Sequence, residues 1–165
     1  MLLLRAAIFT LLIPGTVTVL VPYVLLHSDL DSAVRIPPML RVVGLVPLAA
    51  GITVYLWCVW DFAASGRGTP APYDPPCVLV TRGLYAFVRN PIYVGIVSII
   101  FGEALLFDSI AVLGYGALLL VLFHLRVLLY EEPQLRRKFG ASYDEYCHSV
   151  SRWFPRKTRR TEPSP

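Results

Sequence analysis

Charged residues are scarce in this chain. Only 16% of its 165 residues are Asp, Glu, Lys or Arg, and 56% are hydrophobic, whereas an ordinary soluble domain has about 25% charged residues. Half of the charged residues lie after Tyr130, so the preceding part contains long uncharged runs. This composition predicts an integral membrane protein. The length favours one compact domain over a membrane anchor joined to a separate water-soluble enzyme.

The sequence also lacks the usual patterns of metal and dinucleotide sites. The three cysteines, Cys58, Cys77 and Cys147, are far apart and share no metal-ligand spacing, so we expect reduced structural thiols and no metal. Gly66 and Gly68 lie in a proline-rich loop with no strand before it, and no glycine-rich strand-turn-helix fingerprint occurs elsewhere. A Rossmann-type cofactor site is therefore not supported.

Long apolar stretches separate the few charges. The first contains 23 uncharged residues between Arg5 and Asp29; at about 1.5 Å per helical residue it exceeds the ~30 Å hydrocarbon core. A cleaved signal peptide is the alternative for this stretch, but its apolar core is longer than such peptides have. We expect about four membrane-spanning helices, over residues 6–27, 42–62, 91–107 and 109–130.

The last two stretches are expected to form a tight helical hairpin. Asp108 and Ser109 are the only polar break between them, and either residue is suited to cap the returning helix. Pro91 fits the first turn of a helix, where its missing N–H costs nothing. The predicted fold class is an all-α membrane protein, with one domain over residues 1–155 that ends in a short helical cytoplasmic segment. A disordered basic tail is expected over residues 156–165.

The basic residues predict the orientation of the chain. With four spans, both termini and the middle loop share one face, and most Lys and Arg fall on that face, as cytoplasmic segments require. The net charge of +4 is therefore first a topology signal. Anionic lipid headgroups explain the basic tail better than nucleic acid does. We expect a multi-pass protein in the bilayer with cytoplasmic termini, and the oligomeric state stays open.

If the chain turns at Asp108, polar residues of two segments that are distant in the sequence lie at the same depth in the membrane. By residue count, His124 returns to the depth of Ile92, and Arg126 returns to the depth of Asn90. We expect the following residues to converge where the hairpin meets water: Tyr85, Arg89, Asn90, Pro91, Tyr93, His124, Arg126, Glu131 and Glu132.

Each of these residues also has a purely structural interpretation. The charged residues can be side chains at the membrane interface that reach out to water. The tyrosines can form an aromatic belt at that interface, and His124, taken by itself, can be a packed, hydrogen-bonded histidine. Glu131 and Glu132 are more informative, because adjacent carboxylates repel each other and a cationic partner or ligand would relieve them. Glu103 is the ionisable group deepest in the predicted membrane region. Its role is either a structural hydrogen bond or a function, and the sequence leaves both open.

Two spaced motifs stand in the second half of the chain. The first is Gly-x-Tyr-x-x-x-Arg-x-Pro-x-Tyr from Gly83 to Tyr93, and the second is Glu-Glu-x-x-Leu-x-x-x-Phe-Gly from Glu131 to Gly140. In this order they resemble the isoprenylcysteine carboxyl methyltransferase family and its phospholipid methyltransferase relatives, over about residues 66–155. The resemblance implies an S-adenosylmethionine-dependent methyltransferase whose lipophilic acceptor presents a carboxylate or an amine of a lipid or prenylated compound.

The same resemblance implies the roles of the site residues. The cofactor, held between the hairpin and the polar carboxyl-terminal segment, would contact Tyr85, Arg89, Asn90, Pro91, Tyr93, Glu131 and Glu132, and the catalytic residues would be Arg126 and His124. Asn90 replaces a histidine that the family usually has, and an amide cannot take up a proton near neutral pH. A membrane reductase with a nicotinamide cofactor, similar to sterol reductases, and a noncatalytic membrane scaffold are the alternatives.

Overall fold

The structure is a computed structural model that describes residues 13–28, 36–64 and 79–155. Within these residues the chain is helical, as predicted, and the one β contact recorded is an isolated bridge between Val88 and Ser151. The helical elements are η1 (Thr16–Leu20), α2 (Val21–Leu26), α3 (Pro38–Arg41), η2 (Val42–Gly44), α4 (Leu45–Ala64), η3 (Gly83–Ala86), α5 (Pro91–Leu106), α6 (Ile110–Arg126), η4 (Val127–Glu131), α7 (Glu132–Phe139) and α8 (Ala141–Ser149).

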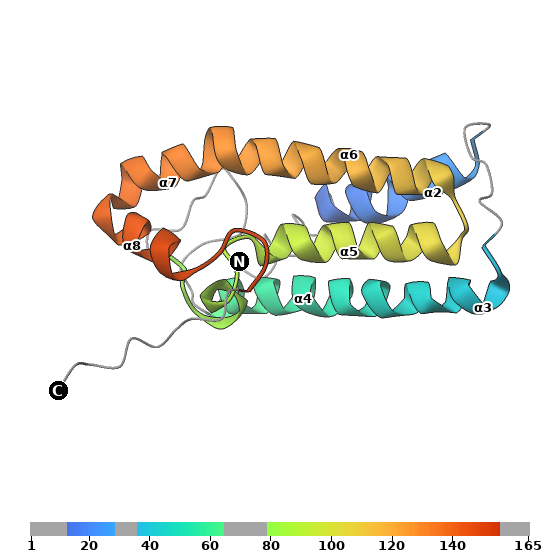
Figure 1. Cartoon of the computed structure of the whole chain (residues 1–165), viewed down its shortest axis with the longest axis horizontal. Coiled ribbons are helices and arrows are strands. Elements are labelled where there is room, and N and C mark those ends of the chain that lie inside the picture. Colours follow the sequence, from blue (N-terminus) through green and yellow to red (C-terminus); the bar gives the residue numbers. More distant parts are fainter. Residues whose placement is uncertain (1–12, 29–35, 65–78, 156–165) are drawn as a thin grey trace.

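Helices α4, α5 and α6 run side by side, and α7 and α8 extend from one end of this layer (Figure 1). Two continuous helical stretches, Pro38–Asp61 and Ile110–Phe139, are long and apolar enough to cross a membrane, and Ile13–Leu26 and Pro91–Leu106 are shorter apolar helices. These findings agree with an integral membrane protein.

The helix limits differ from the predicted spans in two places. The second helical stretch begins at Pro38 instead of residue 42, and the last one continues to Phe139 instead of ending at residue 130. Residues 6–12 of the first predicted span, the proline-rich loop after Ser65 and the predicted disordered tail over residues 156–165 lie outside the described residues.

Glycines allow a close contact between α4 and α5. Gly51 of α4 lies against Gly95, and Gly44, the last residue of η2 directly before α4, lies against Gly102, so α4 and α5 are antiparallel. A Cβ atom added at Gly51 would lie 2.6 Å from the carbonyl oxygen of Gly95, and one added at Gly44 would lie 2.6 Å from that of Gly102. Small residues permit this backbone approach between membrane helices, where van der Waals packing replaces the hydrophobic effect as the driving force.

The turn between α5 and α6 lies at Asp108 and Ser109, as predicted. Asp108 has a left-handed backbone with φ of 56°, and the Ser109 side chain caps α6 by accepting the N–H of Val112 at 3.1 Å. The buried Asp108 carboxylate accepts hydrogen bonds from the Arg41 guanidinium at 2.7 Å and from the N–H of Ile36 at 3.1 Å. These contacts tie the turn to Arg41 at the end of α3 and to Ile36 before that helix.

Prolines account for the wide turns inside the helices. The π turns η1 and η4 each end two residues before a proline, Pro22 and Pro133. A proline ring within a helix collides with the carbonyl group four residues earlier, and a π turn relieves that collision by shifting the carbonyl. Because η4 joins α6 to α7, Glu131 and Glu132 stand at a bulge in a continuous helix and not on a regular α-helical stripe.

Candidate active site at the polar end of the helices

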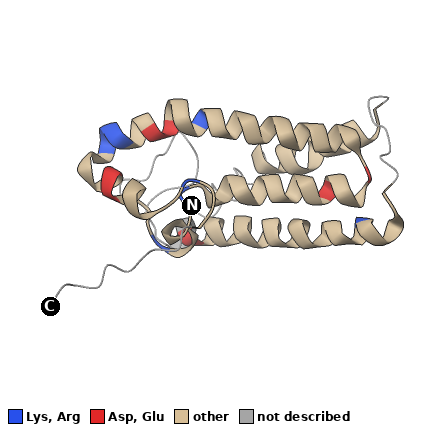
Figure 2. Cartoon of the chain, viewed as in Figure 1, with Lys and Arg blue, Asp and Glu red and all other residues tan. Residues whose placement is uncertain are grey.

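Charged residues are concentrated where α6 continues into α7 and α8, while the middle of the long helices is almost free of them (Figure 2). We call this region the polar end. It contains the segment Gly83–Asn90 before α5, the helices α7 and α8, and a short segment after α8, Ser151–Trp153, that we call the strap. Predicted site residues from both sequence motifs lie here.

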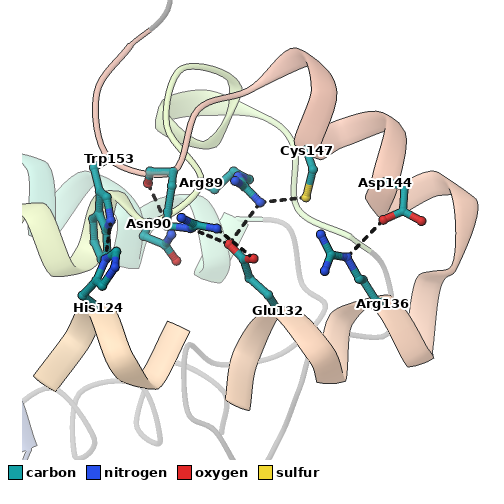
Figure 3. A network of polar contacts seen from close by, with 9 residues as sticks. Arg89, Asn90, His124, Glu132, Arg136, Asp144, Cys147 and Trp153 are labelled. Carbon is teal, nitrogen blue, oxygen red and sulfur yellow. Dashed lines mark hydrogen bonds and ion pairs between the residues drawn. The ribbon is translucent and has the colours of Figure 1, made fainter. Parts of the chain in front are cut away.

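Glu132 is the centre of an ion network at the polar end (Figure 3). Its side chain is only 7% exposed. The Arg152 guanidinium binds both of its carboxylate oxygens, at 2.6 and 3.0 Å, and Arg89 Nη1 lies 3.2 Å from Oε1. The forked contact with Arg152 is the strong, directional kind of ion pair. Two arginines therefore compensate the buried charge of Glu132.

Arg89 joins this network to α8. Its Nη1 also donates to the Cys147 sulfur at 2.7 Å, and its backbone N–H donates to the Ser151 carbonyl at 2.9 Å. Its Nε atom is buried and has no hydrogen-bond partner among the residues that the structure describes. A buried donor without a partner costs about 1–3 kcal/mol, so Arg89 Nε is available to an anionic group of a ligand.

A second cluster joins the start of α5 to the end of α6. The Tyr93 hydroxyl donates to the Glu131 carboxylate, and Arg126 Nε donates to the same oxygen at 2.9 Å. The Tyr93 ring stacks on Phe123 with ring centroids 4.5 Å apart. The structure thus brings Tyr93, Arg126 and Glu131 together. Arg126 therefore pairs with Glu131.

The strap closes over the same region. Its Ser151 carbonyl accepts the N–H of Arg89, and the carbonyl of Arg152 accepts the Asn90 side-chain amide at 3.3 Å. Trp153 Nε1 donates to His124 Nδ1 at 3.1 Å. The strap therefore contacts the segment before α5 and the helices α6 and α7, and both Asn90 and His124 point at it (Figure 3).

A small apolar core includes Val150, the residue directly before the strap. Buried Tyr143, Tyr146 and Val150 pack with Leu79, Leu135, Phe139 and Cys147. The Tyr146 hydroxyl donates to the Tyr85 carbonyl at 2.6 Å. Burial raises the pKa of the Tyr85 phenol well above its usual value, and burial also raises the pKa of Tyr146. Both hydroxyls therefore stay neutral near neutral pH.

The first motif has structural reasons for its glycine and proline. Gly83 has a φ of 61°, and an added Cβ would lie 2.0 Å from Asp61 Oδ2. Both the backbone conformation and the space therefore exclude a side chain. Pro91 is buried at the first position of α5, as predicted for a residue without an N–H.

Sequence reasoning missed Cys147, Arg152 and Trp153. Arg152 and Trp153 are neighbours in a short stretch after α8, and this unusual pair of residue types was the available signal. Glu103, in contrast, lies near the other end of α5 and outside the polar end. Its Oε2 atom is buried with no hydrogen-bond partner among the described residues.

Comparison with known proteins identifies similar sequences. The sequence pattern of the family described as "Phospholipid methyltransferase" matches residues 39–142. The cobalt-zinc-cadmium resistance protein CzcN of Cupriavidus metallidurans is 28% identical over 130 residues, covering 79% of this chain and 55% of that protein. The nickel-cobalt-cadmium resistance protein NccN of Alcaligenes xylosoxydans xylosoxydans is 30% identical over 138 residues, covering 84% of this chain and 60% of that protein. The chain thus spans less than two thirds of the length of either relative.

Proposed function

The chain belongs to the phospholipid methyltransferase family, and from this premise we propose that it transfers a methyl group from S-adenosylmethionine to a lipophilic acceptor at the cytoplasmic membrane face. The observation that carries the proposal is the contact between the two motifs. Tyr93 and Arg89 of the first motif bind Glu131 and Glu132 of the second. All four residues lie within the part of the chain that the family pattern matches.

The orientation in the membrane belongs to the same proposal. Four spans place the polar end, the middle loop and both termini in the cytoplasm, because most Lys and Arg are on that side. The paired Arg41 and Asp108 then lie at the opposite face. A water-soluble cofactor reaches the polar end from the cytoplasm, and a lipophilic acceptor reaches it from the bilayer.

The described residues fit S-adenosylmethionine, which supplies a methyl group already activated by its sulfonium. The unpartnered Nε of Arg89 suits the carboxylate of the cofactor. Glu131 is 25% exposed at its side chain and has oxygen lone pairs left for the ammonium. Glu132 is occupied by Arg89 and Arg152, so we assign it to holding the site together. The protein's contribution is to align the acceptor with the methyl carbon and to exclude water.

The occupied basic groups at the site favour a carboxylate acceptor over an amine. A carboxylate is already deprotonated near neutral pH, whereas an ammonium must first lose a proton to a base. Both glutamates are paired with arginines, and His124 Nδ1 is occupied by Trp153. We therefore propose methyl ester formation.

Binding of S-adenosylmethionine and NADPH by the purified chain tests the proposal. Isothermal titration should show saturable binding of S-adenosylmethionine and none of NADPH. The opposite result would support the membrane reductase, and binding of neither would favour the scaffold. The relatives' names refer to metal resistance, but the described residues contain no group of three or more His, Cys, Asp or Glu that could hold a metal ion. Direct metal binding is therefore not proposed.

The substitution Arg126→Lys should lower kcat/KM for methyl transfer about tenfold, which corresponds to ~1.4 kcal/mol. Arg126 Nε binds the same Glu131 oxygen as Tyr93, and a lysine ammonium lacks the rigid planar guanidinium that directs this N–H. Rates with labelled S-adenosylmethionine in membranes measure the effect. Arg137→Lys, at an exposed position on α7, is the matched control. Wild-type activity in Arg126→Lys would mean that Arg126 is only an interfacial anchor.

A further inference from the structure

The contact between Trp153 and His124 fixes the protonation pattern of the histidine. Trp153 Nε1 lies 3.1 Å from His124 Nδ1, and the ring centroids are 6.0 Å apart. An indole N–H can only donate a hydrogen bond, so Nδ1 must present its lone pair. A neutral imidazole has one proton, which is then on Nε2. Nε2 has no hydrogen-bond partner among the residues that the structure describes.

The position of Trp153 does not depend on His124. The two strap residues before it are held by the backbone N–H of Arg89, the amide of Asn90 and the carboxylate of Glu132. These contacts come from the segment before α5 and from α7, whereas His124 is on α6. The strap thus brings the indole to the histidine in a fixed place, which is how supporting residues preorganise a site.

We propose that Trp153 is a positioning residue that makes His124 a hydrogen-bond donor to a carboxylate oxygen at the site. The proposal rests on the proposed methyltransferase function and gives His124 a role different from that of a proton acceptor. With Nδ1 occupied, the imidazole has no free lone pair for a proton, but its Nε2–H can bind an anionic oxygen. That oxygen belongs either to the amino acid part of S-adenosylmethionine or to the acceptor.

Nitrogen NMR of the histidines tests the arrangement without any activity assay. The chain has three histidines, so the His124 signals in the ¹⁵N-histidine-labelled full chain can be assigned by their loss in His124→Gln. We expect the proton on Nε2 in the wild type and a mixture of both tautomers in Trp153→Phe, which keeps an aromatic ring but loses the donor. A wild-type proton on Nδ1, or an unchanged tautomer in Trp153→Phe, would overturn the proposal.

A matched control lies next to the tryptophan. Phe154, the residue directly after the strap, is 82% exposed, so Phe154→Leu changes a neighbouring aromatic residue and should leave the His124 tautomer unchanged. A shift in this control as large as that in Trp153→Phe would overturn a specific role for Trp153. If Trp153→Phe does not fold, the His124 tautomer of the wild type still tests the proposal, because only a proton on Nε2 is compatible with the proposed donor.

Methyl-transfer rates of two His124 variants separate a donor from a base. The Gln amide N–H can replace an imidazole donor but cannot accept a proton at neutral pH. His124→Gln should therefore lose less of the methyl-transfer rate than His124→Ala, which should lose about tenfold, the range expected for one hydrogen bond. Equal losses in both variants would contradict the donor role.

Titration of His124→Ala with S-adenosylmethionine distinguishes the two sources of the carboxylate. Weaker binding would identify the cofactor as the partner of His124. Unchanged binding together with a slower reaction would identify the acceptor. If the wild-type chain neither binds S-adenosylmethionine nor transfers methyl groups, the proposed function fails, whereas the tautomer measurement still reports on the contact between Trp153 and His124.

Discussion

Glu132→Ala is expected to destabilise the folded chain by about 3–5 kcal/mol, the usual cost of removing one partner of a buried ion pair. The substitution leaves the guanidiniums of Arg89 and Arg152 without their carboxylate, and their side chains are only 12% and 29% exposed. The contacts of the strap with Arg89 and Asn90 should weaken at the same time. Thermal unfolding of the detergent-solubilised chain measures the change.

A glutamate on the surface of the same region provides the control. Glu145 lies exposed on α8, and Glu145→Ala should leave the melting temperature close to that of the wild type, as substitutions at such surface positions usually do. Similar melting temperatures for Glu132→Ala and the wild type would show that the ion network does not hold the polar end together. A weaker effect is expected for Glu132→Gln, because the amide still accepts one hydrogen bond.

Gly51→Val should separate α4 from α5 and destabilise the chain by about 3 kcal/mol, at the upper end of the range for overpacking. The Cβ atom of the new side chain would lie 2.6 Å from the backbone oxygen of Gly95 and 2.8 Å from Ile99. A backbone atom cannot move aside as a flexible side chain can. Since α5 begins with the site residue Pro91, the displacement should also lower S-adenosylmethionine binding.

Gly114→Val is the matched control for this substitution. Gly114 lies on α6, and an added Cβ there meets nothing within 4 Å among the described residues. The same chemical change should therefore be tolerated at this position. Melting temperatures of both variants in one detergent give the comparison, and an equal decrease for the two would contradict a special contact between α4 and α5.

The hairpin was predictable because its signals are local. The polar pair Asp108 and Ser109 interrupts an apolar run, and the serine caps α6 as such residues do at helix starts. The ion pair of Asp108 with Arg41 was not predictable, since it joins residues far apart in the sequence. The glycines behind the α4 contact show a seven-residue spacing in both helices, but only the structure reveals that they face each other.

The sequence predicted which residues gather at the site, but it predicted only in part which of them bind each other. The predicted hairpin put Tyr93 and Glu131 in one converging group, and the Tyr93 hydroxyl donates to the Glu131 carboxylate. The π turn η4 follows α6 and interrupts the regular helix between His124 and Glu131. These two residues bind different partners, since Glu131 binds Arg126 and His124 binds Trp153.

The contribution of the strap could not be deduced from local patterns. Its contacts with Arg89, Asn90 and Glu132 form only when the chain returns after α8. Composition and periodicity describe single elements, and they do not determine where an irregular segment returns. The contacts of the two strap residues Arg152 and Trp153 therefore became visible only in the folded chain.

Transfer of labelled methyl groups tests the proposed chemistry most directly. Membranes containing the chain are incubated with S-adenosylmethionine labelled at its methyl group, and the label in the lipid extract is compared with that from membranes containing Arg126→Lys. We predict label in the lipid fraction that alkali releases as volatile methanol, as a methyl ester requires, and markedly less label from the variant. Equal labelling of the lipid fraction with and without the chain would contradict methyl transfer, and alkali-stable label would contradict the carboxylate acceptor.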